Sequence, residues 1–466
     1  MGVPNINIAL KIAEQMLGRL NKGWTLKDGV YRPSFGREDN KGMALFTRFA
    51  EKLGAEAQTD LAGSAHFRFK GKNSLLPVFM TGSHIDAVPL GGRFDGTIGV
   101  AAGLAAMAML RQAGMTPPQD VVVSILRGEE SAWYSGGKAC LGSNMIVGAL
   151  KYEFLKTAKF KDSAQTLEAR MQNCGIDTHL LKGYMDEGRP LFDLNQIGRY
   201  IEVHIEQGPA LLEAGKSIGI VTDIRGNFRL SFYFTGQSAH TGTTPQKARR
   251  NAGRAAVRFV DRWYDQMDVI RKKKGVDLVN DMVDIKVIDS APTSVPHKAF
   301  VQLEARSNQS DTLSKVGAMT ALLAREVADD MNAGLIYPPH PSISSPSFMS
   351  PEIYAELQAE AYRLGISHLV MPSGAGHDAG IFASAGVPSG MLFVRHGPEG
   401  DGDMSMNFSH CRGERLGLDE NDSGFRPDGD YANAIRVLAE MMMKPASNDD
   451  RTLERPFSAL PVPLAA

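Results

Sequence analysis

Residues 76–84 read LPVFMTGSH, residues 99–114 read GVAAGLAAMAMLRQAG, and residues 121–130 read VVVSILRGEE. The first and third are apolar runs of strand length, and the second is an apolar run of helical length. Another strand pattern, RYIEVHIEQG, follows at residues 199–208. Apolar strands that alternate with helices are typical of parallel sheets with covered faces. We therefore predict an α/β fold with a mostly parallel mixed sheet.

The pattern changes around residue 215. Residues 219–237 have alternating strand character, and helical patterns at 245–267 and 310–331 flank a strand pattern at 299–306. This order predicts a smaller α+β domain inserted into the sheet domain. The predicted ranges are 1–214 and 333–445 for a catalytic domain, 215–332 for the inserted domain, and 446–466 for a Pro-rich tail that is extended or disordered.

The composition is that of an ordinary globular protein. The chain has 466 residues, more than the roughly 250–300 at which a single core stops growing. Its net charge of −1 is too small to attract nucleic acid or an anionic membrane, so a small-molecule partner is expected. Its three cysteines lie far apart and predict a reducing, cytoplasmic location without an export signal. The longest uncharged apolar stretch, about 15 residues, is shorter than the roughly 20 that span a bilayer.

Polar side chains follow the predicted strands, where open α/β sheets place their sites. His84 and Asp86 end the first strand, and residues i and i+2 of a strand point to one side. Asp86 can therefore orient the ring of His84 toward a metal ion; a polar pair near a turn is the alternative. Asp95 lies in a glycine-rich loop, where it can cap the next helix or bind a cation.

Further acids and histidines occur at later strand ends. Glu129 and Glu130 follow the strand VVVSIL, His204 lies within a later strand, and His410 follows a loop near the end of the chain. Buried acids are unfavourable unless a positive charge compensates them, so one acid can bind metal while its neighbour moves protons; a solvated pair is the alternative. Together these residues form a nitrogen and oxygen donor set that suits Zn²⁺ or, less strongly, Mn²⁺ or Co²⁺.

Six blocks of sequence extend this pattern over about residues 75–415. They read TGSHIDAVPLGGRFDGTIGV, RGEES, EVHIEQGPALLEAG, GQSAHTGTTP, SGAGHDAG and NFSHCRGE. In content and order they resemble the hydantoinase/carbamoylase amidases, which are dinuclear metal amidohydrolases within a larger metallopeptidase clan. The blocks HIEQGP and SGAGHDA are much more specific than an HxD pair.

The resemblance implies two divalent metal ions per subunit, with zinc expected first and manganese or cobalt as alternatives. It places His84 and His204 on one ion, Glu130 and His410 on the other, and Asp95 between the two. The charge balance agrees with this implication, because two divalent ions offset the buried carboxylates and leave a locally positive pocket for an oxygen-rich substrate.

The resemblance also assigns the remaining roles. It makes Glu129 the general base and Asp86 the residue that orients His84. It implies a homodimer, formed through an inserted domain that can also close over the metals. The implied substrate contacts are Gln207, His240, Thr293, Arg306, Gly374 and Gly376.

We therefore expect an enzyme that cleaves a linear amide or ureido C–N bond of an N-carbamoyl or N-acyl amino compound. Metal-bound hydroxide would attack the carbonyl, with Glu129 as general base. Two alternatives stay open: an aminoacylase or dipeptidase of the same clan, and a non-catalytic relative that only binds small molecules.

The chain departs from the family pattern next to the paired acids and at the substrate positions. Trp133 and Tyr134 stand where the family commonly has an Arg-Phe pair, and Glu304 stands where Asp is usual. Thr293 occupies the position of the usual carboxylate-binding Asn. Because Thr cannot reproduce the donor and acceptor pair of an amide, either the carboxylate is held differently or the substrate is not a standard N-carbamoyl amino acid.

Overall fold

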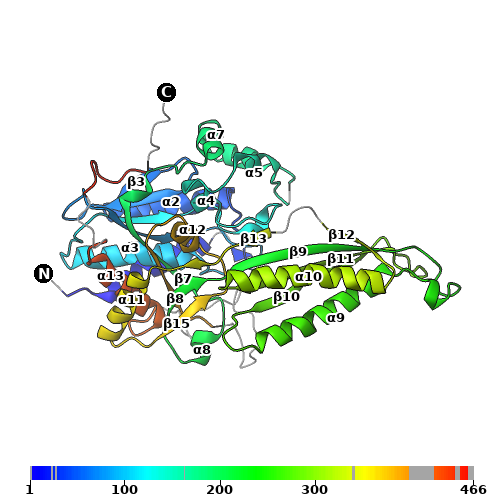
Figure 1. Ribbon diagram of the computed structural model, residues 1–466. Helices are drawn as coiled ribbons and strands as arrows, with labels where there is room; N and C mark the ends of the chain where they lie inside the picture. Colours follow the sequence, from blue (N-terminus) through cyan, green and yellow to red (C-terminus); the bar gives the residue numbers. More distant parts are fainter. Residues whose placement is uncertain are drawn as a thin grey trace. The chain divides into compact units, whose positions relative to one another are not determined.

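The computed structural model describes residues 3–22, 25–26, 29–161, 163–337, 342–397, 425–446 and 452–459. The chain forms two compact units, Met1–Thr222 with Phe348–Ala466, and Asp223–Ser347. The predicted fold class is confirmed, because a mixed sheet with helices forms the first unit and a separate sheet with helices forms the second (Figure 1). The predicted domain ranges stay a prediction.

The first unit is built on a nine-stranded sheet. Its strand order is β14 (Ser347–Phe348), β8 (Ile218–Ile224), β16 (Ser389–Val394), β7 (Ile197–Ile205), β5 (Val78–Ser83), β6 (Val121–Ile125), β4 (Ala65–Phe69) and β3 (Glu56–Thr59), with β15 (His368–Ser373) also paired to β8. The central strands β16, β7, β5 and β6 are parallel neighbours. The pairs β8–β16, β4–β6 and β3–β4 are antiparallel. A separate pair consists of β1 (Thr25–Leu26) and β2 (Gly29–Val30).

One helix is buried for most of its length against this sheet. α3 (Thr97–Gln112) contacts β5, β6 and β7, and its residues 97–110 are all buried. A β-carbon at Gly99 would lie 2.2 Å from the carbonyl oxygen of Val203, so only glycine permits this close approach to β7. α1 (Ile6–Asn21) and α13 (Asp430–Met442) also pack against α3.

Shorter and more peripheral helices complete the first unit. They are α2 (Arg37–Lys52), α4 (Leu141–Ile146), α5 (Tyr152–Thr157), α6 (Leu167–Asn173), α7 (Thr178–Glu187), α8 (Ala210–Glu213), α11 (Pro351–Arg363) and α12 (Asp378–Ser384), with 3₁₀ turns at Ser131–Trp133 and Leu194–Gln196. No helix in the described ranges is both long and apolar enough to cross a membrane.

The second unit is a five-stranded sheet that packs against two helices. The strand order is β10 (Val279–Ile288), β11 (Lys298–Ser307), β9 (Gly226–Thr235) and β12 (Gly334–Ile336), with β13 (Ser342–Ser344) also paired to β9, and the helices are α9 (Ala252–Arg271) and α10 (Ser310–Asp330). The predicted helical pattern started at residue 245, but α9 starts at Ala252. The reason is that the side chain of Asn251 accepts a hydrogen bond from the Arg254 N–H and so caps the helix there.

Residues 452–459 of the C-terminal tail lie against the first unit. They form no helix or strand, but the side chain of Phe457 is only 1% exposed and its ring contacts His66 and Phe192. Arg68 donates a hydrogen bond to the Phe457 carbonyl oxygen. The extended alternative therefore holds for these residues, and the prediction of disorder is wrong for them, because one large apolar side chain fixes the segment.

Candidate metal centre

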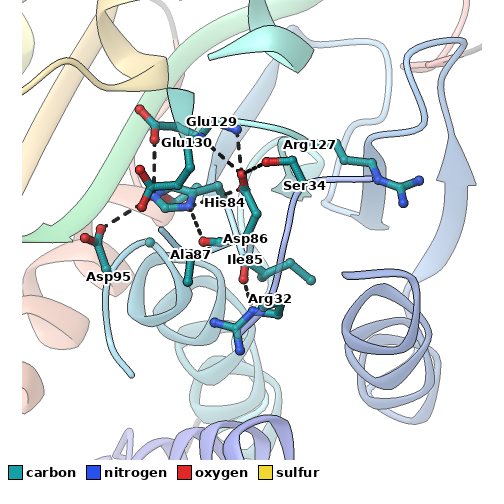
Figure 2. A network of polar contacts seen from close by, with 12 residues as sticks. Arg32, Ser34, His84, Ile85, Asp86, Ala87, Asp95, Arg127, Glu129 and Glu130 are labelled. Atoms are coloured by element: carbon teal, nitrogen blue, oxygen red, sulfur yellow. Dashed lines mark hydrogen bonds and ion pairs between the residues drawn. The ribbon is translucent and has the colours of Figure 1, made fainter. Parts of the chain in front are cut away.

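Five of the predicted site residues meet at the carboxyl ends of the central strands. His84 follows β5, Glu129 and Glu130 follow β6, and His204 is the last residue but one of strand β7. These strands are parallel neighbours, so their carboxyl ends share one edge of the sheet. Asp95 joins them from the loop before α3. Figure 2 shows the side chains of Asp95, Glu129 and Glu130 gathered around His84.

The side chains form two candidate ligand groups that share His84. One contains Asp95 and His204 and the other contains Glu129 and Glu130, and within each group the ligand atoms lie within 4.8 Å of one another. The Asp95 Oδ1 atom lies 3.1 Å from His204 Nε2 and 3.6 Å from His84 Nε2. All five side chains are buried. Imidazole nitrogens and carboxylate oxygens at this spacing fit a divalent cation of the Zn²⁺ type.

Backbone contacts fix the orientation of both imidazole rings. His84 Nδ1 lies 3.0 Å from the carbonyl oxygen of Asp86, and His204 Nδ1 lies 2.9 Å from that of Ile205. Since a carbonyl oxygen only accepts, each Nδ1 carries a hydrogen, and each Nε2 is the ring atom that faces the other site residues and would bind a cation once deprotonated. Gly96 is required beside them: its φ is +65°, and a β-carbon there would lie 2.4 Å from the His84 ring.

The carboxylate of Asp86 connects the two strand ends. Its Oδ1 atom lies 3.5 Å from His84 Nδ1, which leaves the carbonyl oxygen of the same residue as the nearer partner of the ring. The carboxylate also accepts hydrogen bonds from the backbone N–H groups of Glu129 at 3.3 Å and Glu130 at 3.1 Å, and from the Ser34 hydroxyl. Asp86 thus holds the paired acids as well as the histidine (Figure 2).

The site buries more acidic than basic groups. Burial raises the pKa of Glu129 to about 7, and burial together with the neighbouring Asp95 raises the pKa of Glu130 well above its usual value. Burial by itself would lower the pKa of His84, but hydrogen bonds to Asp86 and Asp95 outweigh it and bring that pKa well above its usual value. Buried carboxylates in excess are unfavourable unless cations compensate them, and this charge balance supports a metal site.

The metal-free protein is expected to become less stable as the pH rises from about 5 to 8. The pKa values of Glu129, Glu130 and His84 are raised in the folded state. These groups hold protons that the unfolded chain releases, so their stabilising contribution is complete at low pH and is lost as the pH rises through the folded pKa values. For Glu129, with a pKa that rises from 4.5 to about 7, each unit corresponds to about 1.4 kcal/mol.

Thermal unfolding across this pH range, after chelation and after metal reloading, checks this expectation. Bound cations replace the protons, so the melting temperature of the reloaded protein should depend much less on pH. Equal slopes for the two forms, or a metal-free form that gains stability with pH, would contradict the charge balance inferred for the site.

Trp133 and Tyr134, the aromatic pair that departs from the family pattern, form hydrogen bonds with the backbone around the site. Trp133 Nε1 donates a hydrogen bond of 2.8 Å to the carbonyl oxygen of Ala87, the residue after Asp86. The Tyr134 hydroxyl donates a bond of 2.9 Å to the carbonyl oxygen of Ser34, whose own hydroxyl binds Asp86. Both aromatic side chains are buried. The two bonds therefore fix the backbone on both sides of the Asp86 carboxylate.

Replacement of Tyr134 by Phe is expected to lower the free energy of unfolding by about 1–3 kcal/mol, because it leaves the buried Ser34 carbonyl without this donor. Urea denaturation measures the change. Tyr362→Phe is the matched control, since that side chain is 84% exposed. Equal stability of the two variants would mean that the Tyr134 hydroxyl contributes nothing.

The structure also describes Gln207, Gly374 and Gly376, the other predicted site residues in the described part of the first unit. Gln207, predicted to contact substrate, donates a 2.9 Å hydrogen bond from Nε2 to Asp95 Oδ2, and its φ of +61° fixes the backbone in a left-handed conformation. Gly374 and Gly376 lie in the loop between β15 and α12. His410 lies outside the described residues.

Three predicted substrate contacts belong to the second unit. The structure brings His240 and Thr293 together, because the Thr241 N–H donates a 2.9 Å bond to the Thr293 carbonyl oxygen. Arg306 lies on β11, where its guanidinium pairs with Glu304. Glu304 also binds Arg229, so the acid that replaces the family's Asp holds two guanidinium groups.

Cys140 and Ser34 contact the site residues, although the sequence did not predict either of them as part of the site. The Cys140 thiol donates to Glu129 Oε1 at 3.2 Å, and the Cys140 N–H donates to the Glu129 carbonyl oxygen at 2.8 Å. Ser34 binds Asp86 from a segment 52 residues away. Neither residue belongs to a motif, because both reach the site only through the packing of distant segments.

A mixed α/β sheet with buried imidazoles and carboxylates at its strand ends, in a chain with a second α+β unit, is the architecture of the peptidases and amidases to which the following comparison assigns the chain. The chain belongs to the peptidase family M20/M25/M40, whose family model matches residues 80–443. The predicted family resemblance and the predicted enzyme class are therefore confirmed.

Named relatives share most of the chain. The N-carbamoyl-L-amino-acid amidohydrolase of Rhizobium meliloti is 28% identical over 370 residues, which cover 78% of this chain and 83% of the relative. The allantoate amidohydrolase of Escherichia coli is 28% identical over 415 residues, 89% and 92% of the two chains. The crystal structure of a hydantoinase/carbamoylase family amidase from Burkholderia multivorans has a TM-score of 0.77 at 27% identity and covers 95% of this chain and 99% of that chain.

Proposed function

We propose that this protein is a metal-dependent amidohydrolase that cleaves the linear C–N bond of an N-carbamoyl or related ureido amino compound. The observation that carries the proposal is the buried cluster of Asp95, Glu129 and Glu130 around His84 and His204. The names of the relatives, an N-carbamoyl-L-amino-acid amidohydrolase and an allantoate amidohydrolase, agree with this substrate class.

Two divalent cations are proposed for the cluster, with Zn²⁺ first and Mn²⁺ or Co²⁺ as alternatives. His84 and His204 would hold one, Glu130 and His410 the other, and Asp95 both. The position of Asp95 supports this division, since its Oδ1 faces the Nε2 atoms of both described histidines. When bound, the cations polarise the substrate carbonyl and lower the pKa of water.

Glu129 is proposed as the general base. The Cys140 thiol holds its Oε1, while its Oε2 lies on the side of His84, 3.9 Å from Nε2. A carboxylate in this position can both take and give a proton. Glu129 would take the proton of the water that attacks the carbamoyl carbon and pass it to the departing nitrogen, which leaves as the amine. The released carbamate then decomposes to CO₂ and ammonia.

The remaining assignments are part of the same proposal. Gln207, Gly374 and Gly376 of the first unit, and His240, Thr293 and Arg306 of the second, would contact the substrate. His240 would donate a hydrogen bond to the oxyanion that develops. A homodimer, closure of the second unit as a lid, and a cytoplasmic location are proposed with it.

A substrate panel tests the proposal. The metal-loaded enzyme is incubated with N-carbamoyl, N-acetyl and ureido amino compounds and with dipeptides, and ammonia and free amine are measured separately. Ammonia and amine in equal amounts from a carbamoyl or ureido compound support the proposal. Amine without ammonia, from acetyl compounds or dipeptides alone, would make the protein an aminoacylase or dipeptidase. Two metals per chain without turnover of any compound would make it a binding protein.

A further inference from the structure

The first unit has a cavity that is lined by none of the residues assigned to the metals. Its volume is about 500 Å³, and it lies between the start of α2 and the segment that includes α6. This volume falls within the range of about 300–1,000 Å³ found for small-molecule sites. The charged side chains that line it are Arg37, Lys41 and Arg170, and the amide side chains are Asn40, Gln165 and Asn173.

Within the part of the chain that the structure describes, no acid compensates the positive charge of this cavity. None of the residues that line it is a carboxylate, and no carboxylate in the described ranges forms an ion pair with its three cations. The nearest described acids in sequence have other partners or positions. Asp39 is bound to Arg127 at 2.8 Å, Glu168 accepts a hydrogen bond from Tyr152, and Glu38 does not line the cavity.

Arg170 shows the imbalance most clearly. Its guanidinium lies beside Gly36, since a β-carbon added to that glycine would be 3.6 Å from Arg170 Nη2. Gly36 directly precedes α2 and has no side chain that could cap the helix. The amino end of a helix is itself positive, so a guanidinium is placed where an anion is favoured. The Phe160 ring holds the guanidinium there, 3.8 Å from its centroid. Arg170 Nε is buried without a hydrogen-bond partner, which is unfavourable until an acceptor is supplied.

We propose that this cavity is a binding site for a small organic oxyanion, with a phosphate or carboxylate head group between Arg37, Lys41 and Arg170. Guanidinium and ammonium groups form charge-assisted hydrogen bonds with such oxyanions. The cavity also has an apolar side, formed by Phe35 and Cys174, which would take up the carbon part of the ligand. The proposal stands on this cavity alone and does not depend on the proposed amidohydrolase activity.

Isothermal titration calorimetry on the full-length protein tests the site with inorganic phosphate, phenyl phosphate and succinate at constant ionic strength. Phosphate can also bind to metal ions, so each titration is repeated after chelation. We expect saturable binding that survives chelation, with phenyl phosphate tighter than inorganic phosphate. Binding of succinate but not of the phosphates would assign a carboxylate as the head group, and the reverse would assign a phosphate.

Arg170→Gln is expected to weaken binding about tenfold, which corresponds to about 1.4 kcal/mol, and a triple variant with Arg37→Gln and Lys41→Gln should abolish it. Lys52→Gln, at the other end of α2, removes the same charge outside the cavity and should change the Kd less than twofold. Melting curves show that each variant is folded. Binding that is lost on chelation, or that is equally strong in the triple variant, would overturn the proposal.

Discussion

Replacement of Glu129 by Gln is expected to lower kcat by about 10²–10⁴-fold, the range in which a positioned acid or base contributes, while the metal content stays near that of the wild type. Gln keeps the shape of Glu and can still accept from the Cys140 thiol, which lies 3.2 Å from Oε1. It cannot take up a proton, so the loss should fall on kcat and not on KM. Metal analysis, steady-state kinetics and melting curves together measure the result.

Glu360→Gln is the matched control for this experiment. Glu360 is also largely buried, but its carboxylate pairs with Arg363 and Lys444 on the surface of α11. The same chemical change there should leave kcat within about twofold and act on stability alone. If Glu129→Gln instead released both metals at unchanged stability, Glu129 would be a ligand, and the division of roles between Glu129 and Glu130 would be wrong.

The convergence of the acids and histidines could be predicted because it depends on strand order and not on side-chain detail. His84, Glu129 and His204 each end or nearly end an apolar strand, and parallel neighbours bring such ends to one edge. The sheet of the second unit could also be predicted, because the sequence pattern changes around residue 215. Alternation of apolar and polar residues there predicts strands with one covered face.

The contacts around the cluster could not be predicted, because they depend on segments that meet only in the folded chain. Cys140 reaches Glu129 because it precedes α4 with a φ of +53° and its N–H donates to the Glu129 carbonyl oxygen. Gln207 is predicted to contact substrate, and in the structure its amide also donates a hydrogen bond to Asp95. Its position beyond β7 indicated the site but not which partner in the site its side chain would bind.

Replacement of Asp95 by Asn is expected to reduce the bound metal from the proposed two ions per chain to one or none and to abolish turnover. Asp95 is the carboxylate that faces both His84 and His204. Its pKa lies well below the usual value because, although burial opposes ionisation, hydrogen bonds with the two imidazoles outweigh that effect. The charged form is therefore ready to bind cations over the whole neutral pH range, and a neutral amide removes that charge with little change in volume.

The stability of the variant separates loss of metal from loss of fold. Ligand binding stabilises the folded state by RT ln(1 + [L]/Kd), so added Zn²⁺ should raise the melting temperature of the wild type and have little effect on Asp95→Asn. Asp177→Asn is the control, because Asp177 caps α7 at the surface and Asn caps a helix equally well. If Asp95→Asn still bound two ions per chain with the wild-type increase in melting temperature, Asp95 could not be the shared ligand. The two cations would then have to be held by separate sets of residues.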